Sequence, residues 1–486
     1  MSSSIIDKIL EYEKSQPDKV CLIDDFCKVT YKQYVEKIRK YAQGLYEKGL
    51  KPKDIVVIEA CPTIEYLAIQ MAIYLIGAVF VPIEQHCAKE KIDMFIKNTS
   101  AKAVITLRDN KYEVEICMTY EDIKEFESKM PYIPQKCIKE DDICEILFST
   151  GTTGKEKGII ITHQNNIALA ENVIHGVKME KDNVELIACP MNHSHGLRRY
   201  YANMYNGSTV VLLGNIMNIK RFIELLNDYK VNSIDLVPAA LSIILHLTKE
   251  KLAEYKEQIR YIQFGSAPLK GEDKTKICEL LPNTRLYNFY GSTESGCIAI
   301  YDFNCKKSKS NCIGKPTYNA NILITDENRN IIMSSKDNSG YIASYGKMNM
   351  IGYWNDEDET KKVLADGIIY SNDVAYFDED GEILLLGRKG DIINVGGHKV
   401  SPNEIEDVVR NIERVADCAV IPVEDKFKGN VPKLFVQMEK GYEFNPVSIR
   451  DFIMANLEPY KVPQYIEQID KIPRSYNGKI LRRELK

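Results

Sequence analysis

Between about Asp54 and Gly291, short runs of apolar and β-branched residues alternate with longer segments in which apolar and polar residues are mixed. The short runs have the composition of buried strands, and the longer segments have that of helices. Alternation of this kind favours parallel sheets whose faces are covered by helices. The strands we expect in this region lie at residues 55–59, 103–107, 185–189, 209–213, 233–237, 261–264 and 285–289.

After residues 313–316 the pattern changes to closely spaced strands with short turns between them. Residues 338–340 and 378–381 carry the glycine, asparagine, aspartate and serine that such turns require. This part of the chain predicts a small antiparallel, barrel-like unit. From about Arg388 to the end of the chain, a further short α/β segment follows.

A stretch rich in glycine and charge, residues 387–391, interrupts two apolar strands and is the best candidate for a domain boundary. A chain of 486 residues is also longer than one hydrophobic core usually serves. We therefore expect an α/β protein with a large N-terminal domain at residues 1–387, built of two α/β subdomains and a small β-barrel-like subdomain. A hinge at residues 388–390 would lead to a small, mobile α+β C-terminal domain at residues 391–486.

One run, residues 66–83, is apolar enough to resemble a membrane span. It contains Gln70, Gly77 and Pro82, which are unfavourable in a lipid-facing helix. The run therefore predicts a core helix that breaks at Gly77 and leads into a strand at residues 78–81. We expect no membrane insertion.

Composition and charge exclude several classes of protein. Hydrophobic residues make up 44% of the chain and charged residues 27%, which is ordinary for a soluble globular protein. The net charge of -5 argues against a general nucleic-acid binder. The thirteen cysteines are scattered without a CxxC pair or a metal-ligand spacing. Together with the lack of a signal peptide, this indicates reduced thiols and a cytoplasmic location.

The most informative segment is a loop of hydroxyl, glycine and lysine residues at residues 149–158, between two apolar runs that read as strands. Small residues let backbone N–H groups approach an anion closely, hydroxyls add donors, and lysine adds positive charge. The segment is not a Walker A loop, because the glycine spacing of that motif is missing, and no GxGxxG is present. It predicts a phosphate-binding loop, and the alternative is a flexible surface connection.

Residues 149–158 resemble the phosphate loop of the adenylate-forming (ANL) superfamily, which includes acyl-CoA ligases, adenylation domains of peptide synthetases and luciferases. The resemblance continues in chain order through most of the sequence. The matching motifs lie at residues 265–269 (Gly-Ser-Ala-Pro-Leu), 288–294 (Asn-Phe-Tyr-Gly-Ser-Thr-Glu), 352–355, 371–373, 387–388, 396–402 and 473–480.

The resemblance implies ATP-dependent activation of a carboxylic acid to an acyl-adenylate with release of pyrophosphate, followed by transfer to the thiol of CoA. Carboxylate, α-phosphate and departing pyrophosphate would then share one site, where the protein positions and neutralises them. ATP, Mg²⁺ and CoA are the implied ligands. The alternative acceptor is the phosphopantetheine of a free carrier protein, loaded by a stand-alone adenylation enzyme. A catalytically silent nucleotide sensor is disfavoured, because every charged motif position except the pivot at Gly390 keeps a competent side chain.

By the same resemblance, the loop holds the β- and γ-phosphates of ATP, Thr293 donates to the α-phosphate, and Glu294 carries Mg²⁺. Lys479 places its ammonium between the carboxylate and the α-phosphate. His193, in a Pro-x-x-His-x-x-Gly pattern, lies beside the acyl carboxylate, with His195 as a second candidate, although a lone histidine after a strand is more often a core residue. The loop residues are Ser149, Thr150, Gly151, Thr152, Thr153, Gly154 and Lys157.

The adenosine part of ATP is also assigned by resemblance. Asp373 is expected to accept both ribose hydroxyls, Arg388 to reach the ribose or a phosphate, and Asn288 to bind the adenine amino group. Taken singly, such residues would be ordinary surface positions. The remaining cofactor-binding residues, the last of them for the pantetheine arm, are Gly265, Ser266, Ala267, Tyr290, Gly291 and Gly397.

This chain departs from the family pattern in four places. Glu156 replaces a common proline, Thr150 replaces a serine, and Asn372 replaces the glycine before the ribose-binding aspartate. Gly390 stands where an aspartate or lysine often serves as the pivot between the domains. Glycine is the freest pivot available, so we expect domain rotation to be retained.

The identity of the acid stays open. Arg198 and Arg199 follow His193 closely and would suit an anionic group on the substrate, but the favoured alternative is that they pair with surface acids. Gly291 stands where acetate-specific relatives carry tryptophan, which leaves the pocket open beyond acetate size. The aromatic residues that we expect to close the pocket further out are Phe289, Tyr200 and Tyr201.

We predict that Lys479→Ala cripples acyl-adenylate formation and spares thioester formation from a supplied acyl-adenylate. Loss of a charge contact that is made in the transition state costs on the order of a few kcal/mol. ATP–pyrophosphate exchange measures the first step, and AMP release from the added adenylate in the presence of a thiol measures the second. Exchange activity that survives nearly intact would show that Lys479 does not act in adenylation.

Overall fold

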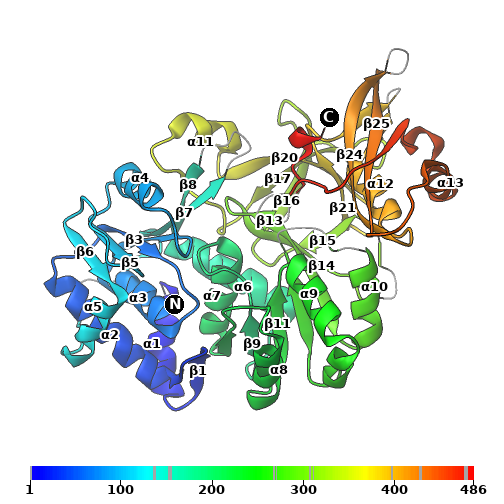
Figure 1. Ribbon diagram of the computed structural model, residues 1–486. Coiled ribbons are helices and arrows are strands. Elements are labelled where there is room, and N and C mark those ends of the chain that lie inside the picture. The colour runs from blue at the N-terminus through cyan, green and yellow to red at the C-terminus, as the bar shows by residue number, and fades with distance from the viewer. Residues whose placement is uncertain are drawn as a thin grey trace.

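The computed structural model describes residues 3–134, 138–150, 156–265, 269, 271–305, 308–309, 311–395, 398–425, 429–474 and 480–485. Two sheets with their helices form the N-terminal part of the molecule, and a third, smaller sheet forms the C-terminal part (Figure 1).

The first sheet has seven strands in the order β18-β8-β7-β4-β3-β5-β6. Strands β7, β4, β3, β5 and β6 are parallel neighbours, whereas β7 and β8 form an antiparallel pair across the predicted phosphate loop. The strands are β3 (Ile55–Glu59), β4 (Val79–Ile83), β5 (Ala103–Thr106), β6 (Ile116–Thr119), β7 (Ile143–Thr150), β8 (Glu156–Thr162) and β18 (Gly352–Tyr353). The helices of this part are α1 (Ile5–Ser15), α2 (Tyr31–Glu47), α3 (Ile64–Ile76), α4 (Lys89–Thr99), α5 (Tyr120–Lys124) and η1 (Glu125–Ser128).

Helix α3 and strand β4 account for the most apolar run of the chain. Thr63 caps the start of α3 by accepting a hydrogen bond from the N–H of Tyr66, and Gly77 ends it with a φ of 83°, which favours glycine. Every residue of α3 except Glu65 is buried, because the helix lies in a core that contains residues of both N-terminal sheets. The predicted core helix and strand are confirmed. No helix in the described ranges is long and apolar enough to cross a membrane.

The second sheet has the order β16-β17-β20-β21-β15-β14-β13-β12-β11-β9-β10-β1-β2, and its strands from β13 to β1 are parallel. The five strands expected between residues 185 and 289 are all present. They are β9 (Val184–Ile187), β10 (Thr209–Leu212), β11 (Ser233–Leu236), β12 (Tyr261–Phe264) and β13 (Arg285–Ser292), next to β1 (Val20–Ile23) and β2 (Lys28–Thr30). The helices are α6 (His163–Val177), α7 (Ser194–Asn206), α8 (Ile219–Asp228), α9 (Pro238–Thr248), α10 (Gly271–Leu280) and η2 (Lys251–Tyr255).

The antiparallel unit expected after residue 313 continues this second sheet. Strand β14 folds back on β13, and β15 joins β14 to the antiparallel set β21, β20, β17 and β16. The elements are β14 (Gly296–Asp302), β15 (Cys312–Pro316), β16 (Asn321–Thr325), β17 (Gly340–Tyr345), α11 (Glu357–Val363), β19 (Leu364–Ala365), β20 (Ile368–Phe377) and β21 (Ile383–Arg388).

The C-terminal part has its own five-stranded sheet, order β23-β22-β25-β24 with β26 beside β25, and its own hydrophobic clusters. Figure 1 shows it in orange and red beside β21 and α10. Strand β21 ends at Arg388 and β22 begins at Ile393, so the expected hinge falls in the connection, and the domain bounds stay a prediction. The elements are β22 (Ile393–Val395), β23 (His398–Val400), α12 (Pro402–Val409), β24 (Val415–Asp425), β25 (Gly429–Met438), α13 (Pro446–Asn456), η3 (Pro459–Lys461), β26 (Tyr465–Gln468) and η4 (Arg482–Glu484).

The cysteines agree with the expectation of reduced thiols. All twelve cysteines in the described ranges are free, and seven of them are buried. Cys137 lies outside the described residues.

Candidate active site

The motif residues meet where the parallel strands β9, β11, β12 and β13 end, the edge at which open α/β sheets bind ligands. Strand β13 runs directly into a tight hairpin with β14. Ser292 and Ser295 close this hairpin, because the backbone N–H of each donates to the other's hydroxyl, at 3.2 and 3.0 Å. The hairpin carries Thr293 and Glu294 at its tip.

Gly291 is required by the close approach of the two strands of this hairpin. A Cβ atom at residue 291 would lie 1.8 Å from the carbonyl oxygen of Gly296, so a side chain there would force the backbone of this hairpin to shift. From the sequence, we expected this glycine to enlarge the acyl pocket. The structure gives a second reason for glycine, the close approach of the two hairpin strands, which does not depend on the identity of the acid.

Glu294 is held by Tyr353, the residue of the Gly-Tyr-Trp-Asn motif that forms β18. The Tyr353 hydroxyl donates to Glu294 Oε1 at 2.9 Å, and the Tyr353 ring lies 5.0 Å from Lys157 Nζ. Burial raises the pKa of Tyr353, and the Glu294 carboxylate raises it further, so the hydroxyl stays a donor. Tyr353 thus contacts both Glu294, the candidate metal ligand, and Lys157, the lysine of the predicted phosphate loop.

Lys157 forms an ion pair with Glu359, on the first turn of α11. Glu359 binds Lys362 with its other oxygen, and these two lysines lower the pKa of Glu359 to about 2. Glu359 belongs to none of the sequence motifs, and its place just after the Gly-Tyr-Trp-Asn motif was the available signal.

Asp373 and Arg388 lie opposite each other on β20 and β21. Arg388 Nε is 3.3 Å from Asp373 Oδ1, and the hydroxyl of Tyr290 donates to Asp373 Oδ2. Burial and the nearby Asp373 raise the pKa of Tyr290 well above its usual value. Three predicted nucleotide-binding residues therefore share one cluster, and both carboxylate oxygens of Asp373 have partners within it.

His193 and Ser194 stand at the start of α7, next to the hairpin. The Ser194 hydroxyl is 3.3 Å from the Thr293 hydroxyl, so two elements far apart in the sequence meet at the predicted α-phosphate donor. Burial lowers the pKa of His193, and its imidazole is therefore neutral at neutral pH. Asn192 Nδ2 lies 3.4 Å from His193 Nε2.

The expectation that Arg198 and Arg199 pair with surface acids is wrong. Arg198 donates to the carbonyl oxygens of Ser292 and Thr293, at 2.8 and 3.4 Å, and so anchors the hairpin. Arg199 is buried and forms an ion pair with Glu185, which is also fully buried. Helix α7 turns Arg198 toward the hairpin, where Nη2 is bonded and the buried Nε has no partner in the described ranges, and turns Arg199 toward the second sheet.

The expectation that Tyr200 and Tyr201 close the acyl pocket is also wrong. Both side chains are buried in the core between the two sheets. The Tyr200 hydroxyl hydrogen-bonds that of Tyr34 at 2.7 Å, and the Tyr201 hydroxyl donates to Glu145 at 2.9 Å. Phe289 packs partly buried against the same core.

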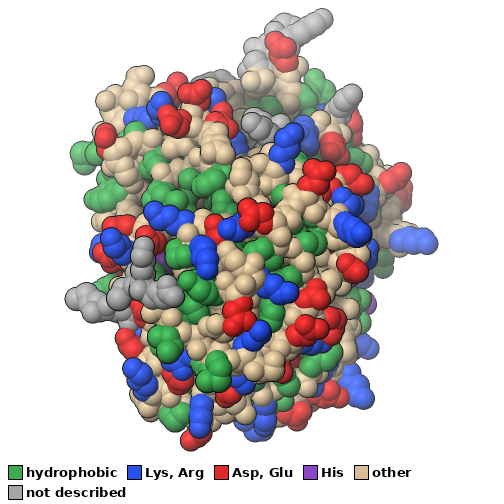
Figure 2. Space-filling model, turned by 90° about the vertical axis from the view of Figure 1, so that its left-hand side faces the viewer, with side chains coloured by type: hydrophobic (Ala, Val, Ile, Leu, Met, Phe, Trp, Pro, Cys, Tyr) green, Lys and Arg blue, Asp and Glu red, His purple; other side chains and the backbone are tan. Residues whose placement is uncertain are grey.

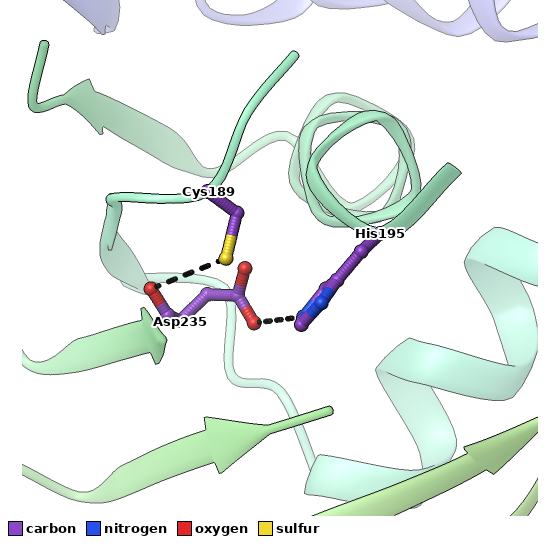
Figure 3. A group of neighbouring side chains, drawn as sticks. All are labelled: Cys189, His195 and Asp235. Atoms are coloured by element: carbon purple, nitrogen blue, oxygen red, sulfur yellow. Dashed lines mark hydrogen bonds and ion pairs between the residues drawn. The ribbon is translucent and has the colours of Figure 1, made fainter. Parts of the chain in front are cut away.

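His195, two residues after His193, contacts Asp235, an acid that belongs to none of the sequence motifs. Its Nε2 atom lies 2.8 Å from Oδ1 of Asp235, on β11. Figure 3 shows the pair together with Cys189, whose Sγ lies 4.0 Å from the carbonyl oxygen of Asp235. An acid inside the apolar run at residues 233–237 was the available signal.

The other predicted residues are placed only in part. Ser149 pairs with Lys157 and Thr150 with Glu156 across the hairpin of β7 and β8, and Asn288 lies half-buried on β13. Gly265 follows β12 directly. Residues that lie outside the described ranges are Gly151, Thr152, Thr153, Gly154, Ser266, Ala267, Gly397 and Lys479.

Two family models match this chain. The model of the AMP-binding enzyme matches residues 11–354, and that of the AMP-binding enzyme C-terminal domain matches residues 404–479. The chain belongs to the AMP-binding enzymes. The resemblance to the adenylate-forming superfamily is thereby confirmed.

Curated relatives match this AMP-binding enzyme over nearly its full length. 4-Coumarate–CoA ligase 2 of Nicotiana tabacum is 27% identical over 497 residues, covering 96% of this chain and 91% of that protein. 2-Succinylbenzoate–CoA ligase of Geobacillus sp. (strain WCH70) is 26% identical over 493 residues, covering 100% of this chain and 98% of that protein.

Solved structures show that this enzyme shares its fold over the whole chain. ATP-bound MatB from Rhodopseudomonas palustris superposes with a TM-score of 0.88 at 22% identity, covering 100% of this chain and 98% of that one. The o-succinylbenzoate CoA synthetase MenE from Bacillus subtilis, in complex with the acyl-adenylate intermediate OSB-AMP, gives a TM-score of 0.85 at 22% identity and covers 99% and 97%. The predicted α/β architecture with a large N-terminal and a small C-terminal part is confirmed.

The buried ion pair between Arg199 and Glu185 should contribute to the stability of the fold. Arg199→Met leaves the Glu185 carboxylate buried without its cation, and breaking a buried pair costs about 3–5 kcal/mol. We expect urea unfolding, followed by circular dichroism, to show a loss of this size. Arg260→Met is the control, because Arg260 pairs with Asp182 and Glu180 at the surface, where such pairs contribute less than about 1 kcal/mol. Equal losses in the two variants would contradict a structural role for Arg199.

Proposed function

We propose that this AMP-binding enzyme is an AMP-forming acid–CoA ligase that activates a small carboxylic acid as its acyl-adenylate and then transfers the acyl group to CoA. The proposal depends on the position of the tip of the β13–β14 hairpin. Thr293 and Glu294 lie between the start of α7, with His193, and the Tyr353–Lys157 contact that leads to the phosphate loop. Sites for an acid and for a polyphosphate therefore adjoin one another.

In the first step, a carboxylate oxygen of the acid attacks the α-phosphorus of ATP, a C–O–P linkage forms, and the bond to pyrophosphate breaks. The neutral imidazole of His193 can donate a hydrogen bond to the carboxylate without fixing it as an ion pair. Thr293 donates to the α-phosphate, and Lys157 and Lys479 neutralise charge on the phosphates and at the new bond. In the second step, the thiol of CoA attacks the acyl carbon, loses its proton, and AMP leaves.

Asp373 and Arg388 support the assignment of the ribose site. The Asp373 carboxylate is fixed by Tyr290 and Arg388 before any ligand arrives, so its direction does not depend on the nucleotide. A carboxylate oxygen has room for more than one hydrogen bond, and ribose hydroxyls can therefore be added to the existing partners.

Glu294 fits a magnesium site. Its Oε1 atom takes the Tyr353 hydroxyl, no residue in the described ranges bonds to Oε2, and carboxylate oxygens are ligands that Mg²⁺ prefers. Bound there, Mg²⁺ would neutralise charge on the phosphates.

The choice of CoA over a carrier protein is supported by the curated relatives. Their names are those of CoA ligases, and this chain covers 91% and 98% of the two described above. Residues 471–486 are locally basic and could contact a carrier protein. They offer no separate argument for one, since Arg474 already pairs with Asp417 and Arg482 with Glu406.

Measurement of both half-reactions tests the proposed function. ATP–pyrophosphate exchange across a panel of aliphatic, aromatic, hydroxy, amino and dicarboxylic acids identifies an acid that supports adenylation. The same acid should then give an acyl-CoA and one AMP per thioester when CoA is added, and no thioester with pantetheinylated carrier proteins alone. Exchange with no acid, or ATP cleavage to ADP, would contradict the proposal.

Glu294→Gln should raise the Mg²⁺ concentration needed for half-maximal exchange by about tenfold or more, since a metal ligand is lost while an acceptor for Tyr353 remains. A magnesium titration of exchange activity measures the shift. Glu180→Gln is a matched control, because Glu180 pairs with Arg260 at the surface, away from the hairpin. An unchanged magnesium dependence in Glu294→Gln would exclude Glu294 as the ligand.

A further inference from the structure

Two successive backbone N–H groups at the tip of the β13–β14 hairpin are open to a ligand. They belong to Thr293 and Glu294, which lie between the two strands and are partly exposed. The N–H groups of Ser292 and Ser295 are occupied, because each donates to the other's hydroxyl. The carbonyl oxygen of Glu294 accepts from Met350 at 2.8 Å, whereas the N–H groups of Thr293 and Glu294 donate to no residue in the described ranges.

Arg198 fixes the direction in which these two N–H groups point. Its Nη2 atom donates to the carbonyl oxygens of Ser292 and Thr293, at 2.8 and 3.4 Å. In a trans peptide the carbonyl and the N–H that follows it point in opposite directions, and the described ranges contain no cis peptide. Because one guanidinium nitrogen holds both carbonyls on one side, the N–H groups of Thr293 and Glu294 both point to the other side. Arg198 Nε is buried, so that other side faces out of the core.

The charge of Arg198 is not neutralised by an acid in direct contact. Acidic and basic side chains are interspersed on the face of the molecule shown in Figure 2, as is usual for a protein surface. Arg198, by contrast, forms no ion pair within the part of the chain that the structure describes. Burial lowers its pKa, and the carboxylates of Glu145 and Glu294 raise it from beyond ion-pair distance. A charged donor polarises the peptide groups that it binds, so the N–H groups at their other ends become stronger donors.

Successive N–H groups that point the same way form a concavity that binds anions. The hydroxyl of Thr293, 3.3 Å from that of Ser194, lies at the same hairpin tip. Thr293 is the predicted donor to the α-phosphate of ATP, whereas the predicted phosphate loop takes the β- and γ-phosphates. On the proposed function, the α-phosphate is therefore the anion that these N–H groups would meet.

We propose that Arg198 is a positioning residue for adenylation, which holds the carbonyl groups of Ser292 and Thr293 inward and so orients the N–H groups of Thr293 and Glu294 toward one non-bridging oxygen of the α-phosphate. Negative charge on this oxygen in the transition state is then stabilised by donors that are already in place. Arg198 itself contacts no substrate. This inference rests on the proposed function and adds a residue to the site described there.

ATP analogues with one sulfur on the α-phosphate test the inference, because sulfur is a weak hydrogen-bond acceptor. The two diastereomers of such an analogue place the sulfur at one or the other non-bridging position. With an acid that supports ATP–pyrophosphate exchange, we expect the wild type to use one diastereomer at least about tenfold less efficiently than the other, in kcat/KM. In Arg198→Met, kcat/KM with ATP should fall at least about tenfold, mainly in kcat, and the ratio between the diastereomers should fall to within about twofold.

Arg199→Met is the matched control. It is the same substitution at the next residue of α7, and Arg199 pairs with Glu185 and not with the hairpin. At a temperature where thermal melts show it folded, its diastereomer ratio should equal that of the wild type. Arg198→Lys keeps the charge without the planar fork of donors, so its ratio should fall at least about threefold. Arg198→Lys carries the test if Arg198→Met does not fold.

Binding of AMP gives a second readout, which needs no turnover. In protein labelled with ¹⁵N-threonine and ¹⁵N-glutamate, AMP should shift the amide resonances of Thr293 and Glu294, which Thr293→Ser and Glu294→Gln assign. In Arg198→Met at saturating AMP, with binding followed by calorimetry, these two shifts should be lost. Arg199→Met should keep them.

The outcomes separate this inference from the proposed function. Equal use of the two diastereomers by the wild type, or an unchanged ratio in Arg198→Met, would overturn the role of Arg198 and leave the ligase activity standing. A preference that reverses when Cd²⁺ replaces Mg²⁺ would assign it to a metal contact and overturn the role as well. If no acid supports exchange with ATP, the proposed function falls too.

Discussion

One buried carboxylate, that of Glu145 on β7, links the first sheet to helices α3 and α7. It accepts hydrogen bonds from the hydroxyls of Tyr74 on α3 and Tyr201 on α7, at 3.1 and 2.9 Å. A buried carboxylate is costly unless its oxygens are satisfied, so these bonds hold the two helices against β7 at one distance. Strand β7 leads into the phosphate-loop hairpin and α7 begins beside Thr293, so the geometry between them is set in the core beneath the site.

The sequence was sufficient to predict the strands of the parallel core and the order of the motifs along the chain. Strands such as β3 and β12 were predicted with their observed ends, because a strand buried on both faces is a continuous apolar run that needs no partner to be recognised. The end of α3 was predictable for an equally local reason, since Gly77 adopts a conformation that other residues avoid. Candidate site residues could be singled out because their motifs are short and contiguous, and their roles stay predictions.

The sequence did not reveal which distant residue each of these side chains contacts. Arg199 lies on a helix face that reads as polar, and only the packing of α7 on the second sheet shows that it turns toward Glu185. Tyr200 and Tyr201 were expected to line the pocket because they are aromatic. Their hydroxyls instead form hydrogen bonds in the core, with Tyr34 and Glu145 respectively. Tyr353 meets Glu294 across 59 residues of sequence, a contact that no local pattern contains.

The ion pair between Lys157 and Glu359 has a consequence for how a ligand enters. Lys157 already has a counterion, so on the proposed function a phosphate would have to displace the Glu359 carboxylate before it gained the lysine. Glu359 keeps Lys362 on its other oxygen, and the displaced carboxylate therefore stays neutralised. Such an exchange favours a polyanion over a singly charged competitor, because several charges act on the same lysine at once. If the loop binds phosphate as proposed, this ion pair would let it discriminate by the number of charges on the ligand before any shape is recognised.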